Sequence, residues 1–185
     1  MTHYDIIIVG SGPSALMCAS NLRNKNILIL EKQEEIGGKI KVSGGGRCNV
    51  TNNKSIEKIM DNLPGNAKFL YPALNNFGPD DIINFFNNNG TTLKEENNNR
   101  MFPTSNKSID IINTFKKILK DNNASIRCNY AVNNIVHDEL NFIINDNYSA
   151  SYLVVATGGK TFNHLGTTGD GYDLLANFDH STTKL

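Results

Sequence analysis

The stretch Tyr4-Asp-Ile-Ile-Ile-Val-Gly10-Ser-Gly12-Pro-Ser-Ala15 decides the fold. Residues 6–9 form a short, wholly apolar run, which is typical of a central parallel strand buried on both faces. Gly10 permits a tight turn from the strand into a helix, and Gly12 has no side chain to keep a pyrophosphate from the backbone. Ala15 supplies the small residue required where the helix meets the strand.

The residues that follow complete a βαβ pattern. Residues 14–22 are expected to form a helix whose N-terminus presents N–H groups and a positive dipole end to phosphates. A second apolar strand, 26–30, ends in Glu31, about 20 residues after the loop, where a ribose-binding acid is expected. Strand, loop, helix, strand and acid in this order predict a dinucleotide site for FAD or NAD rather than NADP. A glycine turn without a ligand is the alternative.

A second glycine-rich signature lies toward the other end of the chain. Residues 151–156 are predicted to form another buried strand, which ends at Thr157-Gly158-Gly159, and Thr168-Gly-Asp-Gly171 opens a helix over 170–177. These two loops resemble those with which flavoproteins hold the same dinucleotide from another side. They favour FAD over a simple NAD-binding domain.

Composition limits the function classes. The 185 residues include 18 basic and 18 acidic side chains, so the formal net charge gives no support for a general nucleic-acid or membrane-surface role. No apolar run approaches the roughly 20 residues of a membrane helix, and the first strand begins too close to Met1 for a signal peptide. We therefore expect a cytoplasmic protein. The three cysteines form no CxxC pair, and the four histidines show no ligand spacing, so no metal is expected.

A third glycine-rich segment occupies residues 43–52, after the pair Gly37-Gly38. Three successive glycines indicate either a close backbone approach to a cofactor or a flexible linker. Arg47 is a candidate contact for phosphate or an anionic flavin, and Asn49 for a polar ring edge. Cys48 is a candidate redox thiol, although no partner cysteine is near it in the sequence, and Cys18 and Cys128 are interpreted as small core residues.

The remaining elements divide the chain into two predicted domains. Residues 54–107 form a mainly helical insertion, with helices at 55–63, 67–77 and 79–88 and paired strands at 92–96 and 100–103. Residues 1–53 and 108–185 form the dinucleotide-binding domain, with a helix at 108–122, a strand at 124–128 and an antiparallel meander from 130 to 148. The predicted fold class is α/β: a doubly wound, Rossmann-like FAD-binding domain with a helical insertion and a small antiparallel meander.

Taken together, these motifs resemble a known family. Lys41-Val-Ser-Gly-Gly-Gly-Arg-Cys-Asn-Val-Thr-Asn52 is similar to the signature of BaiN-like, aminoacetone-oxidase-type NAD(P)/FAD-dependent oxidoreductases. Tyr71-Pro-Ala-Leu74, Arg100-Met-Phe-Pro103 and the segment from Ala156 to Tyr172 match it too. The resemblance covers nearly the whole chain but only the N-terminal half of a family member, so a truncated or split product is expected.

The resemblance implies roles for individual residues. Gly10, Gly12 and Ala15 would cradle the FAD pyrophosphate, Glu31 would hold the adenosine ribose, and Val132 would offer its backbone to adenine. Gly38, Lys39 and residues 46–49 would lie along the ribityl and ring side, with Thr157, Gly158 and Asp170 near the cofactor. The full set of cofactor-binding candidates is Gly10, Gly12, Pro13, Ala15, Glu31, Lys32, Gly38, Lys39, Gly46, Arg47, Cys48, Asn49, Val132, Ala156, Thr157, Gly158, Thr168, Gly169 and Asp170.

The expected function is an FAD-dependent oxidoreductase acting on a small molecule, and the family's name implies NAD(P)H as electron donor. No second Gly-x-Gly-x-x-Gly is present for that donor, and no residue is singled out as catalytic. The alternative is a non-catalytic FAD-binding fragment or subunit that requires a partner carrying the missing C-terminal half. Neither a nucleic acid nor a membrane is expected as partner.

Overall fold

A computed structural model describes residues 1–183. The chain forms two compact units. Unit 1 comprises residues 1–39 and the described residues from 115 onward, and unit 2 comprises residues 40–114. The predicted insertion, 54–107, lies inside unit 2, which also includes 40–53 and 108–114. The last two residues of the predicted dinucleotide-binding domain lie outside the described part.

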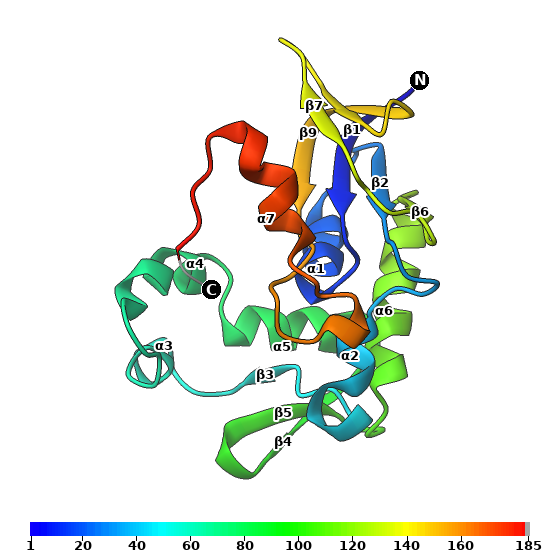
Figure 1. Ribbon diagram of the computed structural model, residues 1–185. Helices are drawn as coiled ribbons and strands as arrows, with labels where there is room; N and C mark the ends of the chain where they lie inside the picture. The colour runs from blue at the N-terminus through cyan, green and yellow to red at the C-terminus, as the bar shows by residue number, and fades with distance from the viewer. Residues whose placement is uncertain (184–185) are drawn as a thin grey trace. The chain divides into compact units, whose positions relative to one another are not determined.

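Unit 1 is built on a mixed six-stranded sheet with the order β6-β2-β1-β9-β8-β7 (Figure 1). The first four strands in this order are parallel, and β8 and β7 continue the sheet in antiparallel pairing. The elements are β1 (Thr2–Val9), α1 (Pro13–Asn21), β2 (Ile27–Leu30), β6 (Ser125–Arg127), β7 (Ile135–His137), β8 (Phe142–Ile144), β9 (Tyr148–Val155) and α7 (Asp170–Leu175).

Successive side chains of the central strands point alternately to the two faces of this sheet. Ile7 and Val9 of β1 pack with Leu28 and Leu30 of β2 in a core cluster that partly buried Leu174 of α7 also contacts. Because strand side chains alternate, Ile6 and Ile8 point to the opposite face, where α1 lies. All four residues of β2 are buried. The predicted doubly wound α/β fold is therefore confirmed.

Small residues bring α1 close to the sheet. Ala15, Leu16 and Ala19 of α1 are completely buried. The helix is also tied to the end of α6 (Ser108–Asp121), because Arg23 donates a 2.9 Å hydrogen bond to the side chain of Asn122. The helix α1 is thus held firmly beneath the carboxyl end of β1, which fixes the position of its N-terminus.

Unit 2 contains a three-stranded antiparallel sheet and several short helices. Several features differ from the prediction, among them an unpredicted short helix over Gly38–Val42. The segment 67–77 is a 3-10 turn followed by a short helix from Tyr71, and Thr51–Asn52 forms an unpredicted strand against Arg100 and Met101. The elements are β3 (Thr51–Asn52), α3 (Ile56–Met60), α4 (Tyr71–Asn76), α5 (Pro79–Asn88), β4 (Leu93–Glu96) and β5 (Arg100–Pro103). The chain passes between the units within α2 (Gly38–Val42) and within α6.

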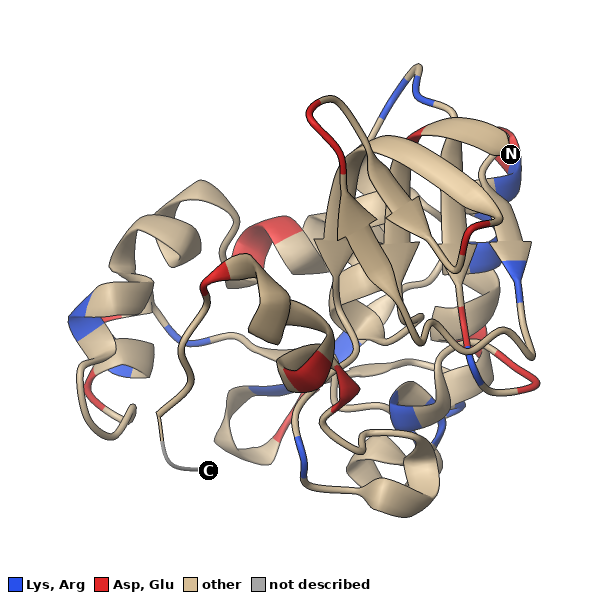
Figure 2. Ribbon diagram, turned by 45° about the horizontal axis from the view of Figure 1, so that its top comes forward, with Lys and Arg blue, Asp and Glu red and all other residues tan. Residues whose placement is uncertain are grey.

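Charges of both signs are interspersed along the ribbon of each unit (Figure 2). Among the described residues, no helix is long and apolar enough to cross a membrane, and no cluster of His, Cys, Asp and Glu is arranged to hold a metal.

Candidate functional site

The loop after β1 is closed by a very near approach of Gly10 to the loop after β9. Gly10 has φ +96°, and a Cβ on it would lie 2.6 Å from the Ala156 carbonyl oxygen. Its N–H donates to Leu30 O at 2.8 Å, and Ala156 N–H donates to Val9 O at 2.8 Å. Three parallel strands therefore end together around one residue that has to be glycine.

Gly12 leaves the N-terminus of α1 open. It is the N-cap residue, with φ −71° and no side-chain capping hydrogen bond, and no heavy atom lies within 4 Å of where its Cβ would be. Pro13 occupies the first turn, which contains no acidic residue. The first N–H groups of a helix have no intrahelical partner and carry positive partial charge. This arrangement fits an anion such as a pyrophosphate.

Glu31 lies beside that loop with its carboxylate held by backbone and side-chain donors. Ser11 N–H donates to Oε2 at 2.9 Å, and the Ser11 hydroxyl donates to the same oxygen at 2.5 Å. Gln33 N–H donates to Oε1 at 2.8 Å. The acid at the end of β2 is therefore oriented next to the phosphate-type loop, as a ribose-binding residue requires.

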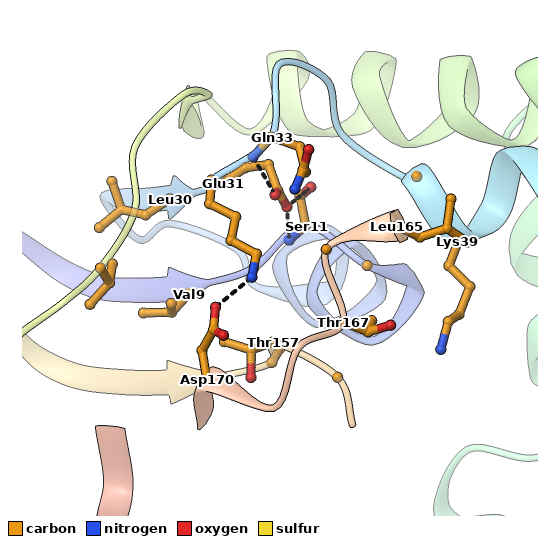
Figure 3. A pocket seen from close by; sticks show the side chains of 18 of the residues that line it. Val9, Ser11, Leu30, Glu31, Gln33, Lys39, Thr157, Leu165, Thr167 and Asp170 are labelled. Carbon is orange, nitrogen blue, oxygen red and sulfur yellow. Dashed lines mark hydrogen bonds and ion pairs between the residues drawn. The ribbon is translucent and has the colours of Figure 1, made fainter. Parts of the chain in front are cut away.

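Lys32 crosses from the end of β2 to the start of α7. Its Nζ lies 2.5 Å from Asp170 Oδ2, the ion pair marked by a dashed line at Asp170 in Figure 3. The same Nζ lies 2.6 Å from the Thr168 hydroxyl, and Thr168 also donates to Asp170. Burial by itself raises the pKa of Asp170. The hydrogen bonds and charge of Lys32, together with Thr168, outweigh burial and hold this pKa below its ordinary value. Lys32 and Asp170 thus form an ion pair beside the candidate site.

The loop between β9 and α7 folds back on itself. The Thr167 hydroxyl donates to Phe162 O at 2.9 Å and accepts from Phe162 N at 3.1 Å. Gly158 has φ +81°, and its Cβ would lie 2.9 Å from a Thr167 methyl. Gly171 packs on Thr157, because a Cβ there would lie 2.5 Å from the Thr157 hydroxyl oxygen. These contacts fix where the loop can lie.

A segment after β6 closes the far side. Asn129 N–H donates to Gln33 O, and Tyr130 N–H donates to Glu31 O, both at 2.9 Å. Tyr130 and Val132 are thereby placed over the end of β2. Arg127 lies 4.9 Å from the centroid of the Tyr130 ring, which stabilises the orientation of that ring.

These elements enclose a cavity of about 240 Å³ within unit 1 (Figure 3). Many of the sequence-predicted site residues line it. Ala15 is instead buried in α1 beneath the loop. Thr168 and Gly169 do not line the cavity themselves but directly precede Asp170, which does. The predicted residues that line it are Gly10, Gly12, Pro13, Glu31, Lys32, Gly38, Lys39, Val132, Ala156, Thr157, Gly158 and Asp170.

Several lining residues were not among the sequence-based candidates. Ser11 is the most informative, since serine at the second position of a glycine loop gives no signal by itself. Gly166 has φ +82°, and side-chain atoms of Gln33 and Lys32 lie within 3.3 Å of where its Cβ would be. The unpredicted lining residues are Val9, Ser11, Ser14, Leu30, Gln33, Glu35, Tyr130, Leu165, Gly166, Thr167 and Leu174.

Gly46, Arg47, Cys48 and Asn49 belong to unit 2, where Arg47 has partners of its own. Its guanidinium donates to both Glu96 oxygens at 3.0 Å and lies 4.2 Å from the Phe102 ring centroid. Cys48 is 6% exposed, and burial raises the pKa of its thiol while a hydrogen bond with Ser43 partly offsets this. The cofactor-binding roles of these four residues stay predictions.

The residues present in unit 1 fit an adenine dinucleotide. The uncapped start of α1 faces open space at Gly12, which suits a diphosphate, and the oriented Glu31 carboxylate beside it suits a ribose hydroxyl. Lys39 adds a cation at the cavity wall, 5.4 Å from the Phe162 ring centroid. Ligands of open α/β sheets bind at this place, outside the carboxyl ends of the strands.

Comparison with known proteins identifies the family of this chain. The family described as HI0933-like protein Rossmann domain matches residues 4–185. The chain belongs to this family. The family is one of FAD-dependent oxidoreductases, so the BaiN-like resemblance is confirmed at family level.

Curated relatives in the family are longer than this chain. It is 28% identical over 183 residues to the ribosomal RNA dihydrouridine synthase of Escherichia coli, covering 96% of this chain and 45% of that protein. It is 26% identical over 185 residues to the 3-dehydro-bile acid delta(4,6)-reductase of Clostridium scindens, covering 96% and 44%. The chain thus spans less than half the length of these relatives.

Solved structures support the fold. A flavocytochrome c3 fumarate reductase matches with a TM-score of 0.72 at 17% identity, covering 97% of this chain and 41% of that one. Mycobacterium smegmatis Sdh1 in complex with UQ1 matches with a TM-score of 0.65 at 16% identity, covering 95% and 38%. These likenesses confirm a Rossmann-like fold of the kind found in flavoproteins.

Proposed function

We propose that this chain binds the adenosine diphosphate part of FAD in the cavity of unit 1. The observation that carries the proposal is the Glu31 carboxylate, which Ser11 holds beside the uncapped N-terminus of α1. A ribose acid and a phosphate-binding helix end, side by side at the ends of parallel strands, are the two elements by which doubly wound folds hold an adenine dinucleotide.

The charges around the cavity support an unphosphorylated ribose. Glu31 is an anion, and the nearby Lys32 is already paired with Asp170 at 2.5 Å. A 2′-phosphate in place of the ribose hydroxyl would therefore lie next to the Glu31 carboxylate rather than next to an unpaired cation. The two negative charges would repel each other. FAD or NAD fits this chemistry better than NADP does, and membership of a flavoprotein family favours FAD.

For the whole protein we propose flavin-dependent reduction of a conjugated carbon–carbon double bond. The names of the two relatives share this chemistry, since a dihydrouridine is a uridine whose ring double bond is reduced, and a delta(4,6)-reductase acts on ring double bonds. When bound, FAD supplies the hydride and electron transfer, and the protein supplies binding and orientation. NAD(P)H as the electron donor is part of this proposal.

This chain covers the cofactor-binding part of such a protein. The chain spans less than half the length of its relatives. We therefore propose that the substrate pocket is completed by a partner that carries the C-terminal region. A non-catalytic FAD-binding half that requires a second polypeptide is the second candidate. That no nucleic acid is a partner stays a prediction, and the name of the first relative makes ribosomal RNA the first nucleic acid to test.

Competition among three nucleotides tests the binding proposal. FAD is titrated into the purified chain by calorimetry, and ADP and FMN are then used as competitors. We expect FAD and ADP to share one site and FMN, which lacks the adenosine half, not to compete. Competition by FMN as strong as by ADP, or none by ADP, would contradict the proposal.

Matched variants locate the site. Glu31→Gln removes the negative charge and replaces one carboxylate oxygen by an amide N–H donor, and it is expected to weaken FAD and ADP binding about tenfold, the usual effect of losing one hydrogen bond to a charged group. Glu34→Gln removes the same charge from an exposed neighbour and is the control. Equal effects of the two variants would place the ligand elsewhere.

Turnover separates the two candidate functions. The FAD-loaded chain is mixed with NADH or NADPH and a conjugated enone, alone and together with a second polypeptide carrying the C-terminal region of a family member. Oxidation of the nicotinamide by the chain alone supports the complete oxidoreductase. Oxidation only with the second polypeptide supports the FAD-binding half.

A further inference from the structure

The Glu31 carboxylate accepts three hydrogen bonds at the cavity. Oε2 accepts two hydrogen bonds from a single residue, Ser11, through its N–H at 2.9 Å and its hydroxyl at 2.5 Å. Oε1 accepts one, from Gln33 N–H at 2.8 Å. Three donors thus fix the Glu31 side chain. Two of them are backbone N–H groups, and the third is the Ser11 hydroxyl, which depends on serine being present at this position.

Ser11 is itself fixed. It is 2% exposed, and its carbonyl oxygen accepts a 3.1 Å hydrogen bond from Gly37 N–H. The hydroxyl is therefore shielded from water, and it donates to Glu31 Oε2. A buried hydrogen bond to an ionised group is worth more than a neutral one. The geometry gives Ser11 a role in setting the Glu31 rotamer.

The Glu31 carboxylate has few acceptor sites left for a ligand. A carboxylate oxygen has two lone pairs, about four per carboxylate. Both sites on Oε2 are used by Ser11, and one of the two on Oε1 is used by Gln33. One acceptor site, on Oε1, is left for a hydroxyl of the bound nucleotide.

We propose that Ser11 is a positioning residue that directs Glu31 to accept from a single ribose hydroxyl rather than from both hydroxyls of the 2′,3′-diol. The proposal rests on the proposed function, because it requires an adenine ribose beside Glu31. It adds a residue and a stoichiometry that the glycine-loop pattern does not contain. With the Ser11 hydroxyl in place, Oε2 has no acceptor site left for the ligand, and only Oε1 accepts a hydrogen bond from the ribose.

Deoxy nucleotides test this on the unmodified chain. The dissociation constants of ADP, 2′-deoxy-ADP and 3′-deoxy-ADP are measured by calorimetry. We expect one deoxy analogue to bind about tenfold more weakly than ADP, the loss of one charged hydrogen bond, and the other to bind within about threefold of ADP. Equal large losses for both analogues, or no loss for either, would overturn the proposal.

The variant Ser11→Ala tests the positioning role. It keeps the backbone donor and removes the hydroxyl, so the carboxylate can rotate and Oε2 regains an acceptor site. We expect ADP to bind about tenfold more weakly and the ratio between the discriminated deoxy analogue and ADP to fall at least threefold. A purely structural role would weaken all three nucleotides alike and leave that ratio unchanged, which would refute the proposal.

Ser20→Ala is the matched control. Ser20 lies near the other end of α1, is 1% exposed, and its hydroxyl has no hydrogen-bond partner among residues 1–183. Removing this hydroxyl is expected to leave all three dissociation constants within twofold. A double-mutant cycle completes the test: in Glu31→Gln, adding Ser11→Ala is expected to change ADP affinity less than twofold, because residues that act through one another are not additive.

The outcomes separate this inference from the function on which it rests. If ADP does not bind the unmodified chain, the proposed function fails and the inference fails with it. If ADP binds and Glu31→Gln weakens it, but Ser11→Ala leaves the deoxy ratio unchanged, the function stands and the inference alone is refuted.

Discussion

Gly10 and Ala156 approach each other so closely that a Cβ on Gly10 would lie 2.6 Å from the Ala156 carbonyl oxygen. These residues are far apart in sequence and end adjacent parallel strands, in which Val9 pairs with Val155. The contact joins the first glycine loop to the loop after β9. It makes the cavity a product of both ends of the chain.

Gly10→Ala is expected to destabilise unit 1. The φ of +96° is unfavourable for any L side chain, and the added methyl collides with backbone atoms that cannot move aside. Gly90→Ala is the matched control, because Gly90 has φ +93° with no heavy atom within 4 Å of its Cβ position. Urea denaturation should show Gly10→Ala losing about 2 kcal/mol more than Gly90→Ala. Equal losses would mean that the close approach to Ala156 does not matter.

Gly12→Ala is expected to impair binding rather than folding. The new methyl meets no atom within 4 Å in the described part of the chain other than its sequence neighbours, and φ −71° suits alanine, so the free energy of unfolding should change by less than about 1 kcal/mol. The methyl would occupy the space through which a pyrophosphate reaches the first N–H groups of α1. Calorimetry should show at least tenfold weaker FAD binding. Unchanged affinity at unchanged stability would place the phosphates elsewhere.

Gly171→Ala tests the packing of α7 on the loop after β9. Its methyl would lie 2.5 Å from the Thr157 hydroxyl oxygen and 3.3 Å from a Val155 methyl. We expect a loss of about 1–3 kcal/mol, and Thr157→Ala should restore part of it because it removes the colliding oxygen. Denaturation of the two single variants and the double variant measures this coupling. Strict additivity would contradict the close contact.

The Lys32–Asp170 pair should give stability a specific pH dependence. The pKa of Asp170 is lowered in the folded state, so its contribution is complete above the ordinary aspartate value of about 3.9 and is lost as pH falls through the lower folded value. Asp170→Asn is therefore expected to be less stable than the parent at pH 7, by about 1 kcal/mol or less for this partly exposed pair, and this difference is expected to shrink as pH falls below the ordinary aspartate value. Asp173→Asn, an exposed aspartate of the same helix, is the control. A stability difference that grows toward low pH would contradict the assigned pair.

Cys48 is expected to react slowly with thiol reagents. It is 6% exposed, and burial raises the pKa of its thiol, so little nucleophilic thiolate is present at neutral pH. In a Cys18→Ala/Cys128→Ala background, a chromogenic disulfide reagent at pH 7.5 should modify Cys48 at least tenfold more slowly than in urea. A rate equal to that in urea would support the redox role instead.

Much of the fold was predictable because its signals are local. The apolar run of β1, the small residues of α1 and the acid after β2 each occur within a few residues of the element they define. An antiparallel hairpin or meander over 130–148 was predicted, but not that Tyr148 belongs to the same strand, β9, with which β8 pairs. The start of β9 was misplaced at residue 151, because Ser149 and Ser151 interrupt the apolar pattern, although Tyr148 and Ala150 are buried.

The partners of the charged site residues were not predictable from the sequence. Arg47 was a candidate for phosphate, but it bonds Glu96, which lies 49 residues away. Lys32 and Asp170 are separated by 138 residues, and only the parallel order of β2, β1 and β9 brings the two ends together. Ser11 carried no signal because its role depends on the rotamer of Glu31. These contacts are tertiary and have no local pattern.

The most direct test of the account is a crystal structure of the chain with FAD. The account predicts the diphosphate at the N-terminus of α1 beside Gly12, and one ribose hydroxyl within hydrogen-bond distance of Glu31 Oε1. A nucleotide bound away from the carboxyl ends of β1, β2 and β9, or a ribose with no contact to Glu31, would contradict it.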